Sequence, residues 1–229
     1  GGGGYSRAIL KHFSVKELIA IDRDPISKIF SKDINHKYQN FTLINDKFSK
    51  IEAVIRKSKL KEKKFDIIIY DLGTSSNQID NPDRGFSFNN EGPLDMRMGL
   101  NEKNAFEIIN KLDEKNLAKI IYEFGEERYS RVIAKEIVKN RKIKFISNTS
   151  QLSQIIKTCL PKNNSRKKTI HPATKTFQAL RIFVNKEITE LLNGIVNASK
   201  VLKPGGKILV VSFHSIEDKI VKYFFSNFS

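Results

Sequence analysis

Hydrophobic residues in the first third of the chain form short runs that alternate with segments of helical period. The runs Leu18–Ile21 and Phe41–Ile44 are short, and Phe65–Tyr70 is a continuous, β-branched run. A run of the last kind is typical of a strand that is buried on both faces. Between the second and third runs, Ser49–Lys59 has apolar residues at helical spacing. Strands that alternate with helices predict parallel β-α-β units.

From about Asn104 to Leu160 the hydrophobic period becomes helical throughout. Each of three sets of apolar residues defines the buried face of an amphipathic helix. Together the three helices are too long for one crossover between strands, so we predict a helical insert. The sets are Leu117, Ile120, Ile121 and Phe124, then Tyr129, Val132, Ile133 and Ile137, then Leu152, Ile155, Ile156 and Leu160.

The α/β pattern returns after a basic polar loop at Pro161–Thr169. Helical patterns cover Phe177–Asn185 and Glu187–Leu202, and the LKPGG sequence ends the second of them. The apolar run Lys207–Phe213 predicts a strand. Residues Ser215–Asp218 match a capping box, so we expect the last helix to begin there and to continue to Phe225.

The composition adds a strong positive charge. Lys and Arg number 41 against 25 Asp and Glu, which gives a net charge of +16. That excess indicates a polyanionic partner, most simply nucleic acid, although a bias toward Lys, Asn and Ile would explain it too. No apolar run approaches the ~18 residues that cross a bilayer, so we expect no membrane partner.

The cysteine and histidine content bears on location and on metals. Cys159 is the one cysteine of the sequence, so it forms no internal disulfide, and a reducing cytoplasm is the expected compartment. The histidines are scattered without the spacing of metal ligands, and we expect no metal site. They are His12, His36, His171 and His214.

Every predicted strand is followed by a polar residue that could contact a ligand. These residues are Asp22, Asp46, Asp71 and His214. Ligands of open parallel sheets bind beyond the carboxyl ends of the strands, although a single Asp at such a junction more often caps a helix. The four ends together predict one binding crevice.

The sequence GGGGYSRAIL places glycines directly before a helix, which is typical of a turn that holds a phosphate or a cofactor. The spacing from Gly4 to Asp22 suits an acid that binds ribose hydroxyls. A nicotinamide cofactor would fit this spacing, but the third glycine of its fingerprint is absent. The LKPGGK sequence at Leu202–Lys207 resembles a turn of class I S-adenosylmethionine-dependent methyltransferases.

Longer stretches resemble the bacterial RsmH (MraW) family, the ribosomal small-subunit RNA (cytosine-N(4))-methyltransferases. They occur in the family's order over nearly the whole chain. The stretches are GGGGYSRAIL, AIDRDP (Ala20–Pro25), DLGTSSNQID (Asp71–Asp80), RGFSF (Arg84–Phe88), GPLDMRM (Gly92–Met98), FGEERYSRVIAKEIV (Phe124–Val138), HPATKTFQALRIFVN (His171–Asn185) and SFHSIEDKIVK (Ser212–Lys222).

The resemblance implies an α/β fold in which the sheet of a class I (Rossmann-like) methyltransferase is interrupted by a helical insert. It implies S-adenosyl-L-methionine as the cofactor and ribosomal small-subunit RNA, or the assembled small subunit, as the partner. The reaction would methylate the exocyclic N(4) amine of a cytosine. The family's cofactor contacts fall on Gly3, Gly4, Tyr5, Asp22, Phe48, Asp71 and Gln78.

These contacts have distinct expected roles. The glycine turn would approach the methionine end of the cofactor, and Asp22 would bind the ribose diol. Phe48 would pack on the adenine ring, although an ordinary core position is the alternative for this residue. Asp71 or Gln78 would face the methyl group that is transferred.

Asp71, Asp95 and His214 are the candidate catalytic residues. Methyl transfer to an amine needs in-line positioning and acceptors for the amine, but no covalent nucleophile. Asp95 lies on a loop rich in Gly and Pro, and an Asp95–Arg97 clasp within the loop is an equal alternative. His214 could relay the amine proton, or it could only shape the start of the next helix.

We expect the methyltransferase domain at residues 1–88 and 171–229 and the insert, as a substrate-recognition domain, at residues 89–170. Arg166–Lys168 would contact RNA phosphates unless this loop is only a solvated surface segment, and His171 would lie on the RNA side of the cleft or staple that loop. The resemblance also implies a first strand before Gly1 and final strands after Ser229, so we expect residues 1–229 alone to aggregate and to lack activity.

Two other functions stay open at this point, and the sequence does not indicate the oligomeric state. One is a non-catalytic RNA-binding or ribosome-assembly protein on a degenerate Rossmann scaffold. Retention of Asp22, Asp71 and Gln78 together disfavours it. The other is a nicotinamide oxidoreductase, which the LKPGG turn disfavours.

Overall fold

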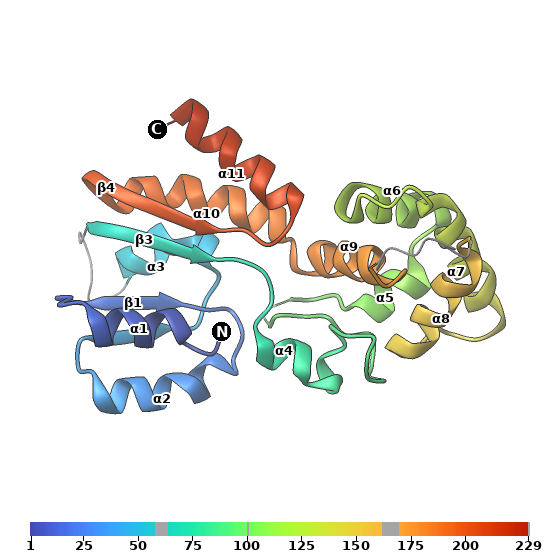
Figure 1. Ribbon diagram of the computed structural model, residues 1–229, viewed down its shortest axis with the longest axis horizontal. Helices are drawn as coiled ribbons and strands as arrows, with labels where there is room; N and C mark the ends of the chain where they lie inside the picture. The colour runs from blue at the N-terminus through green and yellow to red at the C-terminus, as the bar shows by residue number, and fades with distance from the viewer. Residues whose placement is uncertain (58–63, 100, 162–169, 229) are drawn as a thin grey trace. The chain divides into compact units, whose positions relative to one another are not determined.

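The computed structural model describes residues 1–57, 64–99, 101–161 and 170–228 and divides the chain into two compact units (Figure 1). Unit 1 consists of Gly1–Ser75 and Glu187–Ser229, and unit 2 is Ser76–Lys186. From the sequence, the boundaries were predicted between residues 88 and 89 and between residues 170 and 171. The units differ from that division because the helix at Thr174–Asn185 buries its apolar face in the core of unit 2.

Unit 1 contains two parallel strand pairs. Strand β1 (Leu18–Ile21) pairs with β2 (Phe41–Ile44), and β3 (Phe65–Asp71) pairs with β4 (Leu202–Val211). The parallel β-α-β units predicted from the sequence are confirmed. Within the described residues, no hydrogen-bonded ladder joins the first pair to the second.

Helices connect and cover these strands in unit 1. They are α1 (Gly4–His12), α2 (Ser27–Lys37), the 3-10 helix η1 (Phe48–Lys50), α3 (Ile51–Lys57), α10 (Glu187–Val201) and α11 (Ser215–Phe228). The last two match the helices expected from the period of their apolar residues. Strand β4, in contrast, already begins at Leu202, so the LKPGG sequence starts the strand instead of preceding it.

The main core of unit 1 lies between these helices and the strands. Ile68 and Tyr70 of β3 are buried there with Leu191 and Ile195 of α10. Ile19 and Ile21 of β1 pack against the same cluster. The two strand pairs therefore share one core through their side chains, although their backbones do not pair.

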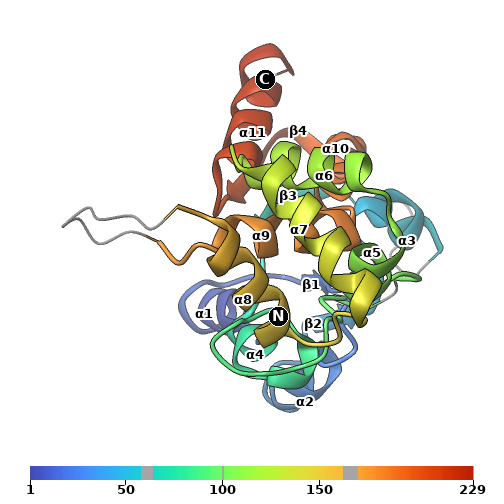
Figure 2. The same ribbon diagram turned by 90° about the vertical axis from the view of Figure 1, so that its right-hand side faces the viewer.

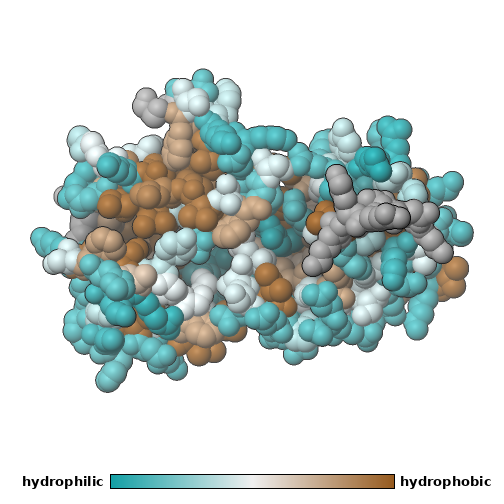
Figure 3. Space-filling model, in the orientation of Figure 1, coloured by the Kyte–Doolittle hydropathy of each residue, from teal (hydrophilic) through white to brown (hydrophobic). Residues whose placement is uncertain are grey.

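Strand β3 is not buried on both faces, and this part of the sequence prediction is wrong. Ile68 is 8% exposed, but Ile67 and Ile69 on the other face are 56% and 39% exposed. Leu209, which lies opposite Ile69 in the ladder, is also exposed. Figure 3 shows the resulting apolar surface over β3 and β4. The run indicates a strand, but which of its faces is covered depends on segments elsewhere in the chain.

Unit 2 is helical, and its helices pack around one core (Figure 2). Its elements are α4 (Ser76–Asp80), the 3-10 helix η2 (Pro82–Arg84), α5 (Ala105–Lys111), α6 (Glu114–Gly125), α7 (Ser130–Ile143), α8 (Thr149–Cys159) and α9 (Thr174–Asn185). Three of these helices carry the apolar sets found in the sequence. Val132 is an exception, because it is 45% exposed on α7.

Side-chain caps fix where several helices of unit 2 begin. Asn104 and Glu107 form a reciprocal capping box at α5, and the side chains of Asp113 and Asn148 accept backbone hydrogen bonds at α6 and α8. Such caps satisfy amide groups that have no partner within the helix. No helix in the described part of the chain is long and apolar enough to cross a membrane.

Candidate functional site

The glycine turn lies at the start of α1 in unit 1. Gly3 is the N-cap and has a left-handed backbone (φ 77°), and no side chain caps the helix. A Cβ atom at Gly3 would lie 2.8 Å from Cδ1 of Ile34, whereas one at Gly4 would meet no atom within 4 Å. The turn therefore presents uncapped backbone amides beside open space, which suits a negatively charged ligand group. Tyr5 follows on the helix and is 49% exposed.

Asp22 follows β1 and organises the loop before α2. Its Oδ1 accepts a hydrogen bond from the backbone amide of Asp24 at 2.8 Å, and its backbone carbonyl accepts one from the side chain of Asn45. The other carboxylate oxygen contacts the amino group of Gly1. One oxygen of Asp22 is thus fixed by the loop, and the other faces a donor from outside it.

Carboxylates from two different strand ends lie near the start of the glycine turn. Asp22 contacts the backbone nitrogen of Gly1, and Asp24 and Asp71 lie close enough to act on this position electrostatically. Burial raises the pKa of the Asp71 carboxyl group. Asp22 and Asp71 therefore both lie near the glycine turn, and a shared cofactor site for them stays a prediction.

Phe48 packs in the core of unit 1. Its ring lies edge-on to that of Tyr70, with 5.3 Å between the centroids, and a Cβ atom on Gly194 would come within 2.8 Å of it. The hydroxyl group of Tyr70 donates to the carbonyl oxygen of Gly194 at 2.8 Å. The contacts of Phe48 are those of the core position considered as the alternative, and a role beside an adenine ring stays a prediction.

Two predicted site residues belong to unit 2. Gln78 lies on α4 and is only 5% exposed. Asp95 lies on the loop before α5, where its carboxylate accepts three hydrogen bonds from Arg97: from the backbone amide and Nε at 2.9 Å and from Nη2 at 2.7 Å. The loop clasp considered from the sequence is therefore present.

His214 lies at the start of α11 and its side chain is 7% exposed. Its Nδ1 atom accepts a hydrogen bond from the backbone amide of Glu217 at 3.4 Å. The side-chain Oε2 atom of Glu217 accepts one from the backbone amide of Phe213 at 2.9 Å. His214 and Glu217 therefore both form hydrogen bonds at the start of α11, whereas the sequence suggested a capping box of Ser215 and Asp218. The physical reason is that a histidine nitrogen can accept the same amide hydrogen bond as a serine hydroxyl.

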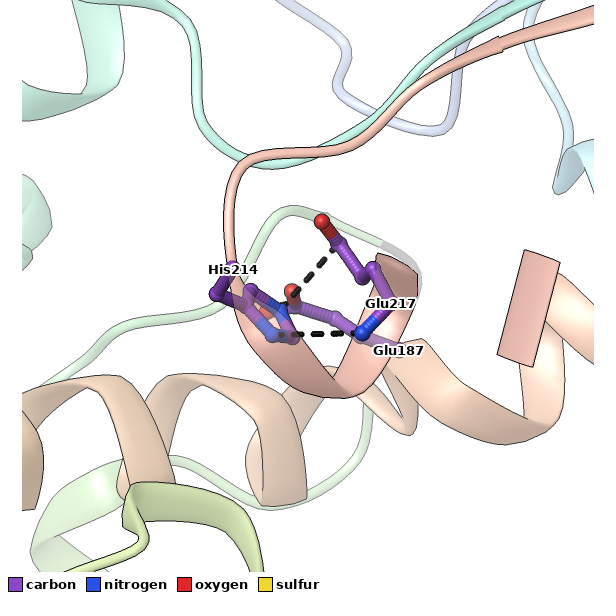
Figure 4. A group of neighbouring side chains, drawn as sticks. All are labelled: Glu187, His214 and Glu217. Atoms are coloured by element: carbon purple, nitrogen blue, oxygen red, sulfur yellow. Dashed lines mark hydrogen bonds and ion pairs between the residues drawn. The ribbon is translucent and has the colours of Figure 1, made fainter. Parts of the chain in front are cut away.

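Glu187, His214 and Glu217 form a compact cluster within unit 1 (Figure 4). One ligand-type atom of each residue lies within 4.8 Å of the others, which is a possible metal geometry. Because Nδ1 of His214 accepts an amide hydrogen, however, the neutral imidazole carries its proton on Nε2. Nε2 lies 3.3 Å from Oε1 of Glu217 without forming a hydrogen bond, and this tautomer has no lone pair on Nε2 for a metal ion.

Sequence reasoning missed several residues of these sites. Asp24 donates its backbone amide to the carboxylate of Asp22, and its position two residues after Asp22 in the DRDP sequence was an available signal. Glu187 was missed because its sequence position, far from His214, gave no indication of the contact. The basic residues Arg166–Lys168 lie outside the described residues.

Comparisons with known proteins show which protein family this chain resembles. A family model described as the MraW methylase family matches residues 1–229. A Rickettsia bellii protein named ribosomal RNA small subunit methyltransferase H is 46% identical over 226 residues, which cover 98% of this chain and 71% of that protein. Proteins of the same name from Ehrlichia chaffeensis and Rickettsia conorii are 45% and 47% identical, and the matches cover 76% and 71% of their lengths.

Proposed function

The chain belongs to the MraW methylase family, and from this premise we propose that it is a methyltransferase that uses S-adenosyl-L-methionine to modify small-subunit ribosomal RNA. The observation that carries the proposal is the family match over residues 1–229. The relatives' shared name supports the ribosomal RNA substrate. Transfer to the N(4) amine of a cytosine, rather than to another atom, rests on the resemblance of the sequence stretches.

The start of α1 suits the methionine end of the cofactor. That end carries a carboxylate, and the uncapped amides behind Gly3 offer it hydrogen-bond donors and the positive end of the helix dipole. Gly4 leaves open space where any larger residue would place a Cβ atom. Tyr5 follows on the same helix, and we assign it to the cofactor site through its backbone.

Asp22 suits the ribose hydroxyl groups. Its Oδ2 atom faces the start of the glycine turn, where it contacts the backbone nitrogen of Gly1. Oδ1 is held by the amide of Asp24, which fixes the direction of the carboxylate. A carboxylate oriented in this way can accept hydrogen bonds from one or both hydroxyls of a ribose diol.

Asp71 is the residue that we assign to the reacting amine. When bound, S-adenosyl-L-methionine supplies an electrophilic methyl group on a sulfonium. The amine that accepts this methyl group would give up one proton, for which a nearby carboxylate of the chain would be the acceptor. Partial burial raises the pKa of Asp71, which makes its carboxylate a better acceptor for that proton than an ordinary one.

The remaining predicted residues have less direct roles. His214 is buried and caps α11, so we assign it to positioning the segment after β4. Asp95 is engaged by Arg97, which leaves it poorly suited to accept a proton. Phe48 and Gln78 are assigned to the cofactor site through the family resemblance.

The test is incubation of the intact protein with methyl-labelled S-adenosylmethionine and purified small ribosomal subunits, followed by nucleoside analysis. We expect label in N(4)-methylated cytidine. Label in a different nucleoside would overturn the assigned substrate atom. Cofactor binding without any labelled RNA would favour the non-catalytic assembly protein instead.

Paired variants test the role of Asp71. Asp71→Asn should lower the transfer rate while cofactor binding changes little, because the amide cannot take the proton. Asp46→Asn is the matched control, since Asp46 also follows a strand but its carboxylate contacts the backbone of Lys47 and the ammonium of Lys50. Equal rates for the two variants would remove Asp71 from the reaction.

A further inference from the structure

Charge is strongly segregated along the sequence of unit 2. Residues 128–186 contain fifteen Lys and Arg but a single acid, Glu136. Residues 76–127 contain six Lys and Arg and eleven Asp and Glu. The positive charge of this unit is therefore a property of its second half, which contains α7, α8 and α9.

Helix α7 concentrates this charge on one face. Arg131, Lys135, Lys139 and Lys142 recur at spacings of four, four and three residues, and all four are exposed. The opposite face is fully buried at Ile133 and Ile137. At ~1.5 Å of rise per residue, successive cations lie roughly 5–6 Å apart along the helix. The result is a straight basic stripe, defined here as these four residues.

Few acidic side chains form ion pairs with the cations of the stripe. Among the described residues, Arg131, Lys135 and Lys142 form no ion pair. Lys139 lies 3.8 Å from Glu136, but its side chain is 70% exposed, so this pair is weak. Most of the charge of the stripe is therefore available to an external anion.

An exposed aromatic side chain lies just beyond the end of the stripe. Phe145 is 65% exposed, and its ring packs edge-on against Phe106, with 6.1 Å between the centroids. Lys144 and Ile143 beside it are exposed as well. Basic residues next to an aromatic platform are the combination that binds single-stranded nucleic acid, because phosphates meet the cations and a base stacks on the ring.

We propose that the basic stripe of α7 contacts successive phosphates of the RNA substrate and that Phe145 stacks on one of its bases. This inference rests on the proposed function and names a substrate-contacting surface for it. A regular row of cations suits a polymer with one charge per repeat better than an acidic peptide of irregular charge. A membrane surface fits poorly, because the apolar face of α7 is buried in the core and cannot enter a bilayer.

The test measures binding of protein-free small-subunit ribosomal RNA to the intact protein over a range of salt concentrations. In the stripe variant, all four residues are replaced by Gln. Loss of four phosphate contacts should reduce the slope of log K against log salt by about 2–3, at roughly 0.7 per contact for a single strand. A wild-type slope would overturn the proposal.

The charge-matched control replaces four exposed lysines from the acidic half of the unit by Gln. These are Lys103, Lys111, Lys115 and Lys119. It removes the same net charge, so an equal loss of slope in both variants would show a general charge effect and overturn the assignment to α7. Urea unfolding of both variants confirms that they are folded, because all eight side chains lie at the surface.

Two further readouts separate this proposal from the proposed function. Phe145→Ala should weaken RNA binding several-fold without changing the salt slope, because stacking releases no counterions. Methyl transfer is measured separately on small subunits. A reduced slope in the stripe variant of a protein that transfers no methyl group would sustain the RNA surface and reject the enzyme. Methyl transfer by a protein whose stripe variant keeps the wild-type salt slope would support the enzyme and reject the RNA surface on α7.

Discussion

The carboxylate of Asp95 and the guanidinium of Arg97 form a two-point pair, with Nε donating to Oδ1 at 2.9 Å and Nη2 donating to Oδ2 at 2.7 Å. Burial opposes ionisation of Asp95, but the hydrogen bonds and the charge of Arg97 outweigh it and hold the pKa of this carboxyl below its ordinary value. The loop is thus fastened by its own side chains, and both oxygens of its acid are occupied.

Replacing Arg97 with Gln should therefore lower the free energy of unfolding by about 1 kcal/mol at neutral pH, since the pair is partly exposed to solvent. The pKa of Asp95 is lower in the folded than in the unfolded chain, so the pair stabilises above roughly pH 4 and loses its effect as the pH falls further. Urea unfolding at pH 7 and at about pH 2, where the carboxyl group is protonated in both states, measures this. A difference from wild type that persists at the lower pH would indicate lost packing instead.

Alanine substitutions at Gly3 and Gly4 should have opposite effects. Gly3→Ala should destabilise the protein by about 1–3 kcal/mol, because its left-handed backbone and the nearby Ile34 methyl disfavour a Cβ atom. Gly4→Ala should leave stability unchanged or raise it by up to ~1 kcal/mol, because the position is helical and unobstructed. It should still weaken cofactor binding in calorimetry, and unchanged affinity would remove this turn from the cofactor site.

Asp22→Ala should weaken binding of S-adenosylmethionine by about 1.5–3 kcal/mol, the range for hydrogen bonds to a charged group. Asp46→Ala is the control, because Asp46 follows the neighbouring strand and contacts Lys47 and Lys50. Isothermal calorimetry of both variants, with unfolding midpoints as a check on the fold, decides the matter. Equal affinities would show that Asp22 only shapes its loop.

Two substitutions of His214 distinguish a role in positioning its segment from a role in proton transfer. His214→Ala should cost about 1 kcal/mol of stability, the value of a lost helix cap, whereas His214→Asn should retain it, because Asn caps helices well. If His214 only positions its segment, the Asn variant should also keep methyl transfer within a few-fold of wild type. A stable but inactive Asn variant would instead assign the amine proton to the imidazole.

Threonine substitutions at two neighbouring isoleucines of β3 should have very different effects on stability. Ile68→Thr should destabilise residues 1–229 by about 2 kcal/mol or more, because Ile68 is 8% exposed in the core. Ile69→Thr should cost less than ~1 kcal/mol and should raise solubility, because Ile69 is part of the exposed apolar surface. Urea unfolding and sedimentation of both variants measure these effects. Equal destabilisation would mean that the Ile69 face is covered in solution.

The sequence predicted the strands more reliably than their environment. Leu18–Ile21 and Phe41–Ile44 occur as predicted, since short apolar runs between turns are local signals. Whether Ile67 and Ile69 are covered depends on segments far along the chain, which the run itself does not encode. Helix α5 was missed for a related reason, because its apolar period is short and its start is marked mainly by the Asn104 and Glu107 capping box.

The candidate site shows the same division between local and distant information. Asp22 and Asp71 were predicted from their places at the ends of strands, which are local signals. The clasp of Asp95 by Arg97 is local and could be considered from the loop sequence alone. The contacts of Phe48 with Tyr70 and of Glu187 with His214 depend on tertiary packing, so no local pattern indicated them.

The division of the chain into a continuous and a discontinuous unit sets an order for folding. Unit 2 is one uninterrupted segment, so all of it has been synthesised once the ribosome passes Lys186. The β3–β4 ladder of unit 1 joins residues such as Asp71 and Val211 that lie far apart in the sequence. On a growing chain, the helical unit can collapse first, and it shortens the loop whose closure the ladder requires. A nascent chain arrested before β4 would therefore hold a folded unit 2 after a strand β3 that still lacks its partner.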